Sequence, residues 1–241
     1  MSFYMMVLII WVLGYKLVNF PSLLNVLEKI LILIHNNILF KAITISMERI
    51  IFGYIISLII GLIVGLIMSK LTYTGENVSN LMASLQSMPN VCWVPFAILW
   101  FGFNEKAILF SIIIGSVFAV AISTESAIKN LNPMYLRVAK MTGAKGYNLY
   151  KNVIIPASMP RIIIGLRQGW AFAWRGLISG EMISSLSGLG QILSEGKKHN
   201  DINEIVAIML VIIILGLLFD KLIFENLQNR VNYKFGTSTK I

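Results

Sequence analysis

Ionisable and aromatic side chains recur at regular spacing along the apolar segment 162–183. Arg167, Trp174 and Glu181 follow one another at intervals of seven residues. At about 100° per residue, this spacing places them on one helix face, which Trp170 shares. Charged groups at membrane depth are costly and usually face a cavity or a partner. The stripe therefore either lines or gates a pathway, or joins two helices through an ion pair and aromatic packing, and the sequence leaves both interpretations open.

Other kinds of chemistry have little support. Arg175 lies off the stripe, as a second pathway charge or a cation that snorkels toward a polar partner. His35 and His199 are far apart in the sequence, without a further ligand at metal spacing. Cys92 is the single cysteine, which excludes an internal disulfide. We expect no catalytic residue, no cofactor-binding residue and no metal ligand, and the chain lacks a G-x-x-x-x-G-K-[ST] phosphate loop.

The composition is that of an integral membrane protein. The 241 residues are 57% hydrophobic and 13% charged, with a mean hydropathy of +0.79, whereas soluble domains carry roughly 25% charged residues. Runs of about 17 to 25 apolar residues bounded by charge predict membrane-spanning helices. The sequence predicts six such spans, at residues 2–20, 50–69, 81–103, 107–122, 162–183 and 205–219.

The amino-terminal region is predicted to differ from the rest. Residues 2–20 lack the basic flank and cleavage site of a secretory signal, so we expect a retained anchor. Residues 21–41 are too polar to span and are predicted to form an interfacial amphipathic helix. Glu48 and Arg49 start the second span and Glu125 ends the fourth, positions typical of interfacial anchors.

Two spans have features that bear on helix packing. Gly61 and Gly65 form a small-xxx-small pair that permits close approach of another helix. Residues 81–103 contain Pro89 and Pro95 and are predicted to form one kinked helix.

Lysine and arginine placement predicts the orientation in the membrane. The segment between the fourth and fifth spans is basic and should be cytosolic, whereas the loops on the other side balance basic and acidic residues. Counting spans from that segment puts both termini in the cytosol. The basic residues of the segment are Lys129, Arg137, Lys140, Lys145, Lys151 and Arg161.

Residues 132–156 form a polar interruption between apolar spans. Asn132 and the proline after it predict a helix start, and Gly143 is a plausible stop. A second short helix can follow Gly146 and end at Pro156, before Pro160 starts the next span. The segment is then a pair of short helices at the membrane face, or else an ordinary basic loop.

Spacing within this segment resembles a family signature. Membrane subunits of ATP-binding-cassette (ABC) importers carry E-A-A, three residues, glycine, nine residues and I-x-L-P. Residues 137–139 here read R-V-A, Gly143 follows at the required distance, and Ile155-Pro156 close the pattern. Arg137 stands in place of the glutamate.

Further segments resemble the sulfonate/nitrate/taurine permease branch of that family. Residues 88–107 resemble its proline-rich run ending in W-F-G, and 154–174 resemble its L-P-x-x-x-P followed by G-x-R. Glu181 and the S-G-L-G of 187–190 match the acidic residue and glycine turn that come next. The resemblance covers roughly residues 44–232.

The resemblance implies an all-α integral membrane protein with about six transmembrane helices, the type I ABC importer permease fold and cytosolic coupling helices. It implies a permease core over 44–225 with the coupling element at 132–156 and a cytosolic tail over 226–241, and the anchor and interfacial helix predicted from the residues occupy 1–43. The residues implied to contact an ATPase are Arg137, Val138, Ala139, Met141, Gly143, Ala144, Gly146, Ile155 and Pro156.

The resemblance also implies the partners and the activity. ATP and magnesium would be bound by separate ATPase subunits, and this chain would hold no cofactor. A second permease chain, as a homodimer, an extracytoplasmic solute-binding protein and the lipid bilayer are the other expected partners, and nucleic acid is not.

The expected function is that of a permease subunit, not an enzyme, in a prokaryotic plasma membrane. It would import a small solute such as a sulfonate, taurine, nitrate or a vitamin precursor by ATP-driven alternating access. An ion-coupled secondary transporter or channel and a small intramembrane enzyme are the alternatives.

Overall fold

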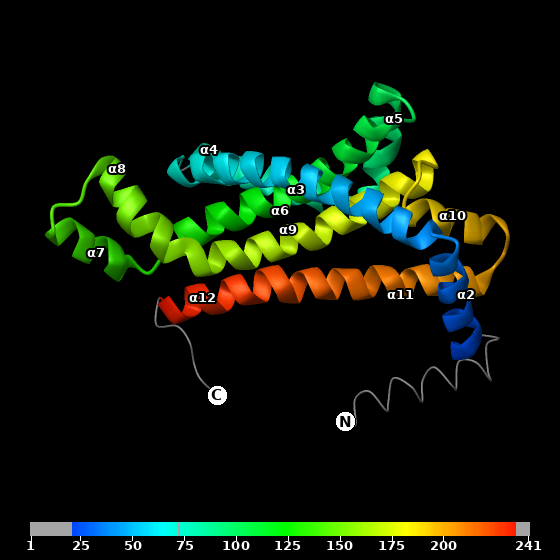
Figure 1. Cartoon of the computed structure of the whole chain (residues 1–241). Coiled ribbons are helices and arrows are strands. Elements are labelled where there is room, and N and C mark those ends of the chain that lie inside the picture. The colour runs from blue at the N-terminus through cyan, green and yellow to red at the C-terminus, as the bar shows by residue number, and fades with distance from the viewer. Residues whose placement is uncertain (1–20, 72, 235–241) are drawn as a thin grey trace.

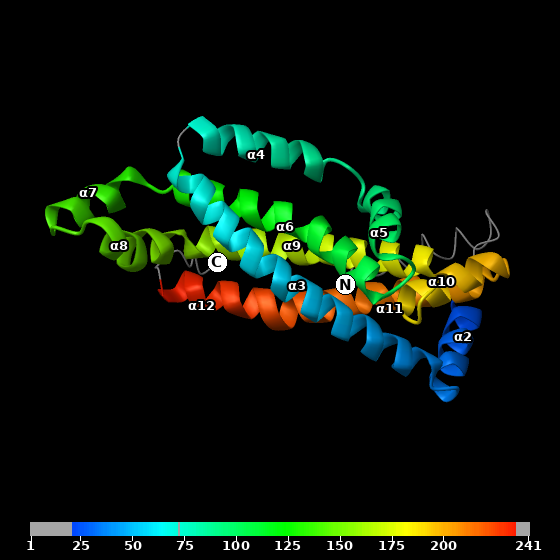
Figure 2. The same cartoon turned by 90° about the horizontal axis from the view of Figure 1, so that it is seen from above.

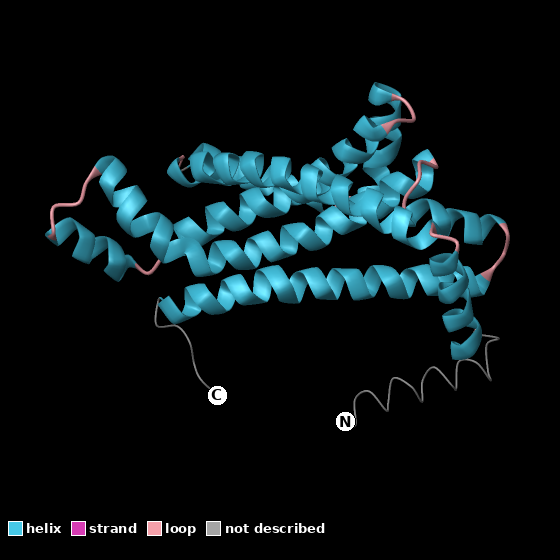
Figure 3. Cartoon of the chain, viewed as in Figure 1, coloured by secondary structure: helices cyan, strands magenta, loops and turns pink. Residues whose placement is uncertain are grey.

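The computed structural model describes residues 21–71 and 73–234, and this part of the chain is helical, with turns and no strand (Figure 3). The elements are α2 (Leu23–His35), α3 (Ile38–Lys70), α4 (Tyr73–Gln86), the 3-10 turn η1 (Asn90–Cys92), α5 (Trp93–Phe101), α6 (Glu105–Lys129), α7 (Pro133–Met141), α8 (Gly146–Leu149), the π-helical turn η2 (Tyr150–Ile154), α9 (Ile155–Ser184), α10 (Leu189–Lys198), α11 (Ile202–Phe219), the π-helical turn η3 (Asp220–Glu225) and α12 (Asn226–Lys234). The all-α fold class is confirmed.

The long helices form an elongated bundle (Figure 1). Helix α6 packs against both α3 and α9, and α11 continues through η3 into α12 along the same axis (Figure 2). Helices α7 and α8 lie at one end of the bundle, and α2 and α10 lie at the other (Figure 1). The long helices α3, α6, α9 and α11 therefore connect an end formed by α7 and α8 to an end formed by α2 and α10.

Glycines bring α3 and α6 into close contact. A Cβ atom added at Gly61 would lie 2.7 Å from the Val120 Cβ, and one at Gly65 would lie 2.5 Å from the Ala121 carbonyl oxygen. Neither distance is sterically possible, so larger residues would force the helices apart. The predicted close approach at this small-xxx-small pair is confirmed.

Three helices of the described part are long and apolar enough to cross a membrane: Ile38–Lys70, Glu105–Lys129 and the continuous Ile202–Tyr233. Helix α9 has 30 residues but carries several charges, and the predicted span 81–103 is divided between shorter helices. The predicted anchor at 2–20 lies outside the described residues.

Helix α3 begins at Ile38, twelve residues before the predicted start of the second span at Ile50. The predicted interfacial helix ends at His35, because Asn37 adopts a left-handed backbone conformation with φ 55° between α2 and α3. Glu48 and Arg49 therefore lie inside α3 and not at a helix start, and Arg49 is buried whereas Glu48 is exposed.

The prediction of one kinked helix over residues 81–103 is also wrong. Helix α4 ends at Gln86, and the chain turns before η1 and α5. Pro89 has no N–H to continue the α4 ladder, and it disfavours helical geometry at Met88. A full break results, with the polar side chains around it on the surface between α4 and α9.

The predicted helix end at Pro156 is wrong for a different reason. The helix that starts at Gly146 continues through η2 into α9 and passes both prolines. The Ile155 N–H bonds to the Tyr150 carbonyl, five residues back. This π-helical turn comes directly before Pro156, which has no backbone N–H to donate to the helix. Such turns let a helix continue past a residue that interrupts its hydrogen bonds. The second short helix of the pair is thus the start of α9.

Candidate functional site

Helix α7 has well-defined ends. The Asn132 side chain caps its start by accepting a hydrogen bond from the Met134 N–H at 3.0 Å. At the other end Gly143 has a φ of +79°, and the Ala144 N–H bonds to the Ala139 carbonyl at 3.0 Å. These are the features of a Schellman motif, which favours glycine at this position. The predicted start and stop of this helix are confirmed.

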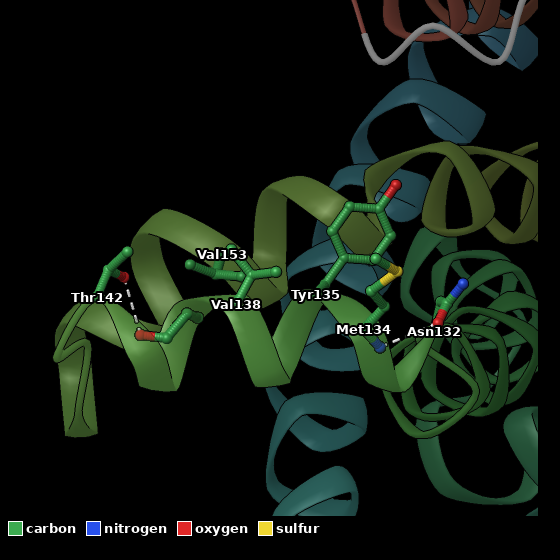
Figure 4. Close-up of a pocket in the computed structure, with 7 residues that line it drawn as sticks. Asn132, Met134, Tyr135, Val138, Thr142 and Val153 are labelled. Carbon is green, nitrogen blue, oxygen red and sulfur yellow. Dashed lines mark hydrogen bonds between the residues drawn. The ribbon is translucent and has the colours of Figure 1, made fainter.

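The outer face of α7 exposes apolar side chains. Met141 is 87% exposed, Met134 68% and Val138 53%. Beside them lies a groove of about 510 Å³ between α7 and η2, in which Tyr135, Val138 and Val153 stand close together (Figure 4). Exposed apolar clusters rimmed by polar residues mark interaction sites. We call this face, from Asn132 to Thr142 with Val153, the α7 surface.

The residues expected to contact an ATPase have several environments. Arg137, Val138, Met141, Gly143 and Gly146 are exposed, whereas Ala139 is 4% exposed and packs beneath α7. Ala144, Ile155 and Pro156 are half-buried. Ile155 and Pro156 belong to the first turn of α9 rather than to a separate helix.

An apolar cluster attaches the α7 surface to the bundle. Ile128 at the end of α6, Leu131 in the following turn and Ile154 in η2 are buried together. Arg161 of α9 also donates a hydrogen bond to the Asn130 carbonyl at 2.5 Å. Leu136 of α7 packs against this cluster, so α7 is in contact with the end of α6 and with the turn that leads into α9.

Glu181 lies in a buried charge cluster at the opposite end of α9. Its side chain is fully buried and accepts hydrogen bonds from Ser46 at 2.8 Å, Arg49 at 2.8 Å and the Gly190 N–H at 2.9 Å. The start of α10 closes over it, because a Cβ at Gly188 would lie 2.3 Å from the Glu181 carboxylate. The cluster joins α3, α9 and α10.

Arg49 is the residue that the sequence analysis missed. Its guanidinium is only 8% exposed and bridges Glu181 to Glu105, and it also donates to the Ser187 carbonyl at 2.5 Å. The partner of Glu181 is thus on α3, not on its own helix. An arginine followed by twenty apolar or small residues could have suggested burial, but only if the helix start had been placed correctly.

Arg167 and the two tryptophans lie together elsewhere. A groove of about 590 Å³ runs between α9 and α11–η3, and we call it the α9–α11 groove. It is lined by Ile164, Arg167, Gln168, Trp170, Ala171, Trp174, Arg175, Ile212, Gly216, Leu217 and Asp220. Arg167 is paired there with Asp220, with Nε to Oδ1 at 2.6 Å. Trp170 and Trp174 pack edge to face at 6.2 Å.

The fold and these sites define a helical membrane protein with an exposed apolar face at one end and an open groove along a charged helix. The family model described as "Binding-protein-dependent transport system inner membrane component" matches residues 57–233. The chain belongs to this family, since the match covers well over half of it.

Relatives and solved structures agree with this assignment. An ABC transporter permease protein of Methanocaldococcus jannaschii is 30% identical over 222 residues, covering 88% of this chain and 83% of the relative. The aliphatic sulfonates transport permease of Escherichia coli is 31% identical over 136 residues, 56% of this chain and 52% of the relative. The crystal structure of an amino acid ABC transporter has a similar fold, with a TM-score of 0.68 at 16% identity over 83% of this chain and 96% of that one.

The protein is the transmembrane permease subunit of an ABC importer, a multi-pass protein of the inner membrane. The predicted family, fold and function are confirmed. ATP hydrolysis belongs to separate ATPase subunits, and this subunit is not an enzyme.

Proposed function

We propose that this permease works as a pair of identical chains, couples to its ATPases through the α7 surface, and receives a small solute from an extracytoplasmic binding protein. ATP and magnesium are bound by the ATPases. Sulfonates, taurine, nitrate and vitamin precursors are the candidate solutes, and the sulfonate permease among the relatives supports the first of these.

The observation that carries the coupling proposal is the exposure of apolar side chains at the end of the bundle formed by α7 and α8. Met141 and Tyr147 are 87% and 74% exposed and extend beyond the long helices with α7 and α8 (Figure 1). Helix α7, which carries Met141, is short, basic and capped, and its exposed side chains lie outside the long apolar helices. A protein cleft that buries such side chains would gain roughly 25 cal/mol per Å² of apolar area.

Charge distribution supports a cytosolic position for this end. Basic side chains gather on α7, in the turn before α8 and on η2, and Lys221 and Arg230 lie toward the same end on η3 and α12. The other end is balanced, because Glu195, Asp201 and Glu204 lie around α10 and the start of α11 together with Lys197 and Lys198. By the positive-inside rule the α7 end is cytosolic, and the predicted span at 2–20 then puts both termini in the cytosol.

A second copy of the chain is supported by the open face of α9. Its exposed residues include Gln168 and Arg175, which a single chain leaves uncovered. A polar stripe at membrane depth requires a water-filled path or another protein surface. Two copies facing each other would enclose such a path.

Copurification tests the coupling proposal. The permease is solubilised in mild detergent with its candidate ATPase, and retention of the ATPase is compared among wild type, Met141→Glu, Gly143→Asp and Lys198→Glu. Met141→Glu places an unpaired charge in the docking face without touching the core. Gly143→Asp disturbs the left-handed turn, and Lys198→Glu changes an exposed charge at the opposite end as the control.

We expect wild type and Lys198→Glu to retain the ATPase, and the two α7 variants to lose at least about 90% of it, a tenfold change or more. Unchanged thermal unfolding of Met141→Glu would show that the loss is one of docking. Retention by Met141→Glu equal to wild type would place the docking surface elsewhere.

A further inference from the structure

The exposed surface of helix α4 is divided into a polar and an apolar sector, which follow from the helical repeat of about 100° per residue. The α4 polar sector comprises four exposed residues, Glu76, Asn77, Asn80 and Ser84. The apolar sector beside it comprises Val78, Leu81 and Leu85, of which Leu81 is 60% exposed. The two sectors therefore suit different surroundings.

Helix α4 lies beside the half of α6 that is nearer the α7 end (Figure 2). The Ser79 hydroxyl donates to Glu125, close to the carboxyl-terminal end of α6, at 3.0 Å. After α4 ends, the Asn90 amide donates to the Phe172 carbonyl of α9 at 2.9 Å and lies against Gly115, near the middle of α6. Because α6 is long and apolar enough to cross a membrane, α4 extends from one membrane surface to about the middle of the bilayer.

The side chains of the α4 polar sector need surroundings that form hydrogen bonds. Within residues 21–71 and 73–234, the side-chain amides of Asn77 and Asn80 have no hydrogen-bond partner, and the Glu76 carboxylate has no ion-pair partner. Hydrocarbon offers no such partner, so an unpaired amide or carboxylate facing lipid is costly. The sector therefore faces water or another polar surface.

A dry contact between the α4 helices of two copies does not suit these side chains. The Ser84 hydroxyl already donates to the Asn80 carbonyl at 2.9 Å, so it is not free to donate across such a contact. Helix α4 carries Glu76 but no basic residue, so a second α4 could not neutralise this carboxylate. Burying an unpaired carboxylate is costly, and water is the surrounding that fits the sector.

The α4 polar sector leads to a cavity at the break that follows α4. This cavity has a volume of about 430 Å³, and its polar lining residues are Gln86, Ser87, Asn90, Arg175 and Ser179. Ser87 follows Ser84 by about one helical turn, so the sector and the cavity form one polar surface. That surface runs from the α7 end to about the middle of the membrane.

We propose that the α4 polar sector lines the cytosolic half of the solute path, and that water fills this half. The apolar sector beside it faces lipid or apolar protein surface. The assignment to the cytosolic side rests on the proposed function, which puts the α7 end in the cytosol. Contact of the sector with water does not depend on that orientation.

Cysteine accessibility tests this assignment in the full-length permease, expressed together with its candidate ATPase and kept in native membrane. Asn80→Cys and Ser84→Cys probe the polar sector, and Val78→Cys and Leu81→Cys are the matched controls from the apolar sector. Each is made in a Cys92→Ser background, because Cys92 is the single cysteine of the chain. Inverted and right-side-out vesicles are treated with 2-sulfonatoethyl methanethiosulfonate, which is charged and does not cross membranes, and the remaining thiols are then counted with a fluorescent maleimide.

We expect Asn80→Cys and Ser84→Cys to react at least about tenfold faster than Val78→Cys and Leu81→Cys, because the reactive thiolate forms in water and a charged reagent does not enter lipid. The reaction should occur in inverted vesicles, together with that of Lys140→Cys, which marks the exposed α7. Reaction of Lys140→Cys only in right-side-out vesicles would refute the cytosolic orientation, whereas the comparison between the two sectors would still test contact with water.

Three results would overturn the proposal. Equal rates in the two sectors, or no reaction of either polar-sector variant while both keep the wild-type Tm, would show that the polar sector does not face a water-filled path. A disulfide that joins two copies through Ser84→Cys under mild oxidation, without reaction with the charged reagent, would assign the sector to a dry contact between copies.

Discussion

Replacing Arg49 with methionine removes the cation that is paired with the fully buried Glu181 carboxylate. Losing one partner of a buried ion pair typically costs about 3 to 5 kcal/mol, because the other charge is left uncompensated. Glu181 keeps its hydrogen bonds from Ser46 and Gly190, but it has no second cation in the described part of the chain. We therefore expect Arg49→Met to fall in that range.

The neighbouring substitutions should cost less, for reasons visible in the same cluster. Glu181→Gln leaves Arg49 paired with Glu105, so about 1 to 3 kcal/mol is expected for the weakened hydrogen bonds. The Glu105 side chain is 58% exposed, and Glu105→Gln should cost under about 1 kcal/mol because solvent screens that pair. The double variant Arg49→Met/Glu181→Gln should be more stable than Arg49→Met alone, since no charge is left unpaired.

Thermal unfolding of the purified chain in detergent, followed by intrinsic fluorescence, measures these differences. For a chain of this size 1 kcal/mol corresponds to about 2 to 4 °C in Tm, so Arg49→Met should lower Tm by roughly 6 to 20 °C. An Arg49→Met variant no less stable than Glu105→Gln would refute the reasoning. So would a double variant whose loss equals the sum of the single losses.

Three further predictions concern packing, charge and capping. Gly65→Ala should destabilise the protein by about 1 to 3 kcal/mol through overpacking against α6, whereas Gly216→Ala, where an added Cβ meets nothing within 4 Å, should be neutral or slightly stabilising; chemical or thermal unfolding compares them. The Lys29–Asp201 ion pair of 2.7 Å lowers the pKa of Asp201 below its ordinary 3.8 and raises the pKa of Lys29 above 10.5. Its contribution to the free energy of unfolding, under about 1 kcal/mol, is complete between these two values and is lost as pH falls through the lowered pKa or rises through the raised one. Lys29→Met and wild type should therefore converge in Tm under acid conditions. Asn132→Ala removes the α7 cap at a cost of about 1 kcal/mol, which should speed amide hydrogen exchange in α7 about fivefold while Tm stays unchanged.

The sequence predicted most reliably the features that depend on local chemistry. Asn132 and Gly143 bound α7 because a capping side chain and a left-handed glycine act within a few residues. Gly61 and Gly65 indicated the α3–α6 contact because small residues permit close approach in any context. The family itself was evident from the order of several motifs.

Features that depend on distant partners were not predictable in the same way. Arg49 was interpreted as an interfacial anchor, since its two carboxylate partners are 56 and 132 residues away in the sequence. The passage of the helix through Pro156 depends on a wider turn that no residue type specifies. Arg167, Trp174 and Glu181 all lie on α9 at the predicted seven-residue spacing. Glu181 is fully buried in the charge cluster, however, whereas Arg167 and Trp174 line the open groove.

The unbroken path from Gly146 through η2 to Ser184 makes α9 a lever that extends from the α7 surface to the turn over Glu181. At 1.5 Å per residue its 30 residues measure roughly 45 Å, so a tilt of about 10° at one end would move the other by roughly 8 Å. The buried contacts of Glu181 with Arg49 and Gly190 hold α9 near its carboxyl-terminal end, so a tilt would move α9 least at this cluster and most near α7. The groove beside Arg175 lies close to the held end. With α9 held at Glu181, the same tilt of about 10° would move the groove wall at Arg175, six residues away, by only roughly 1 to 2 Å.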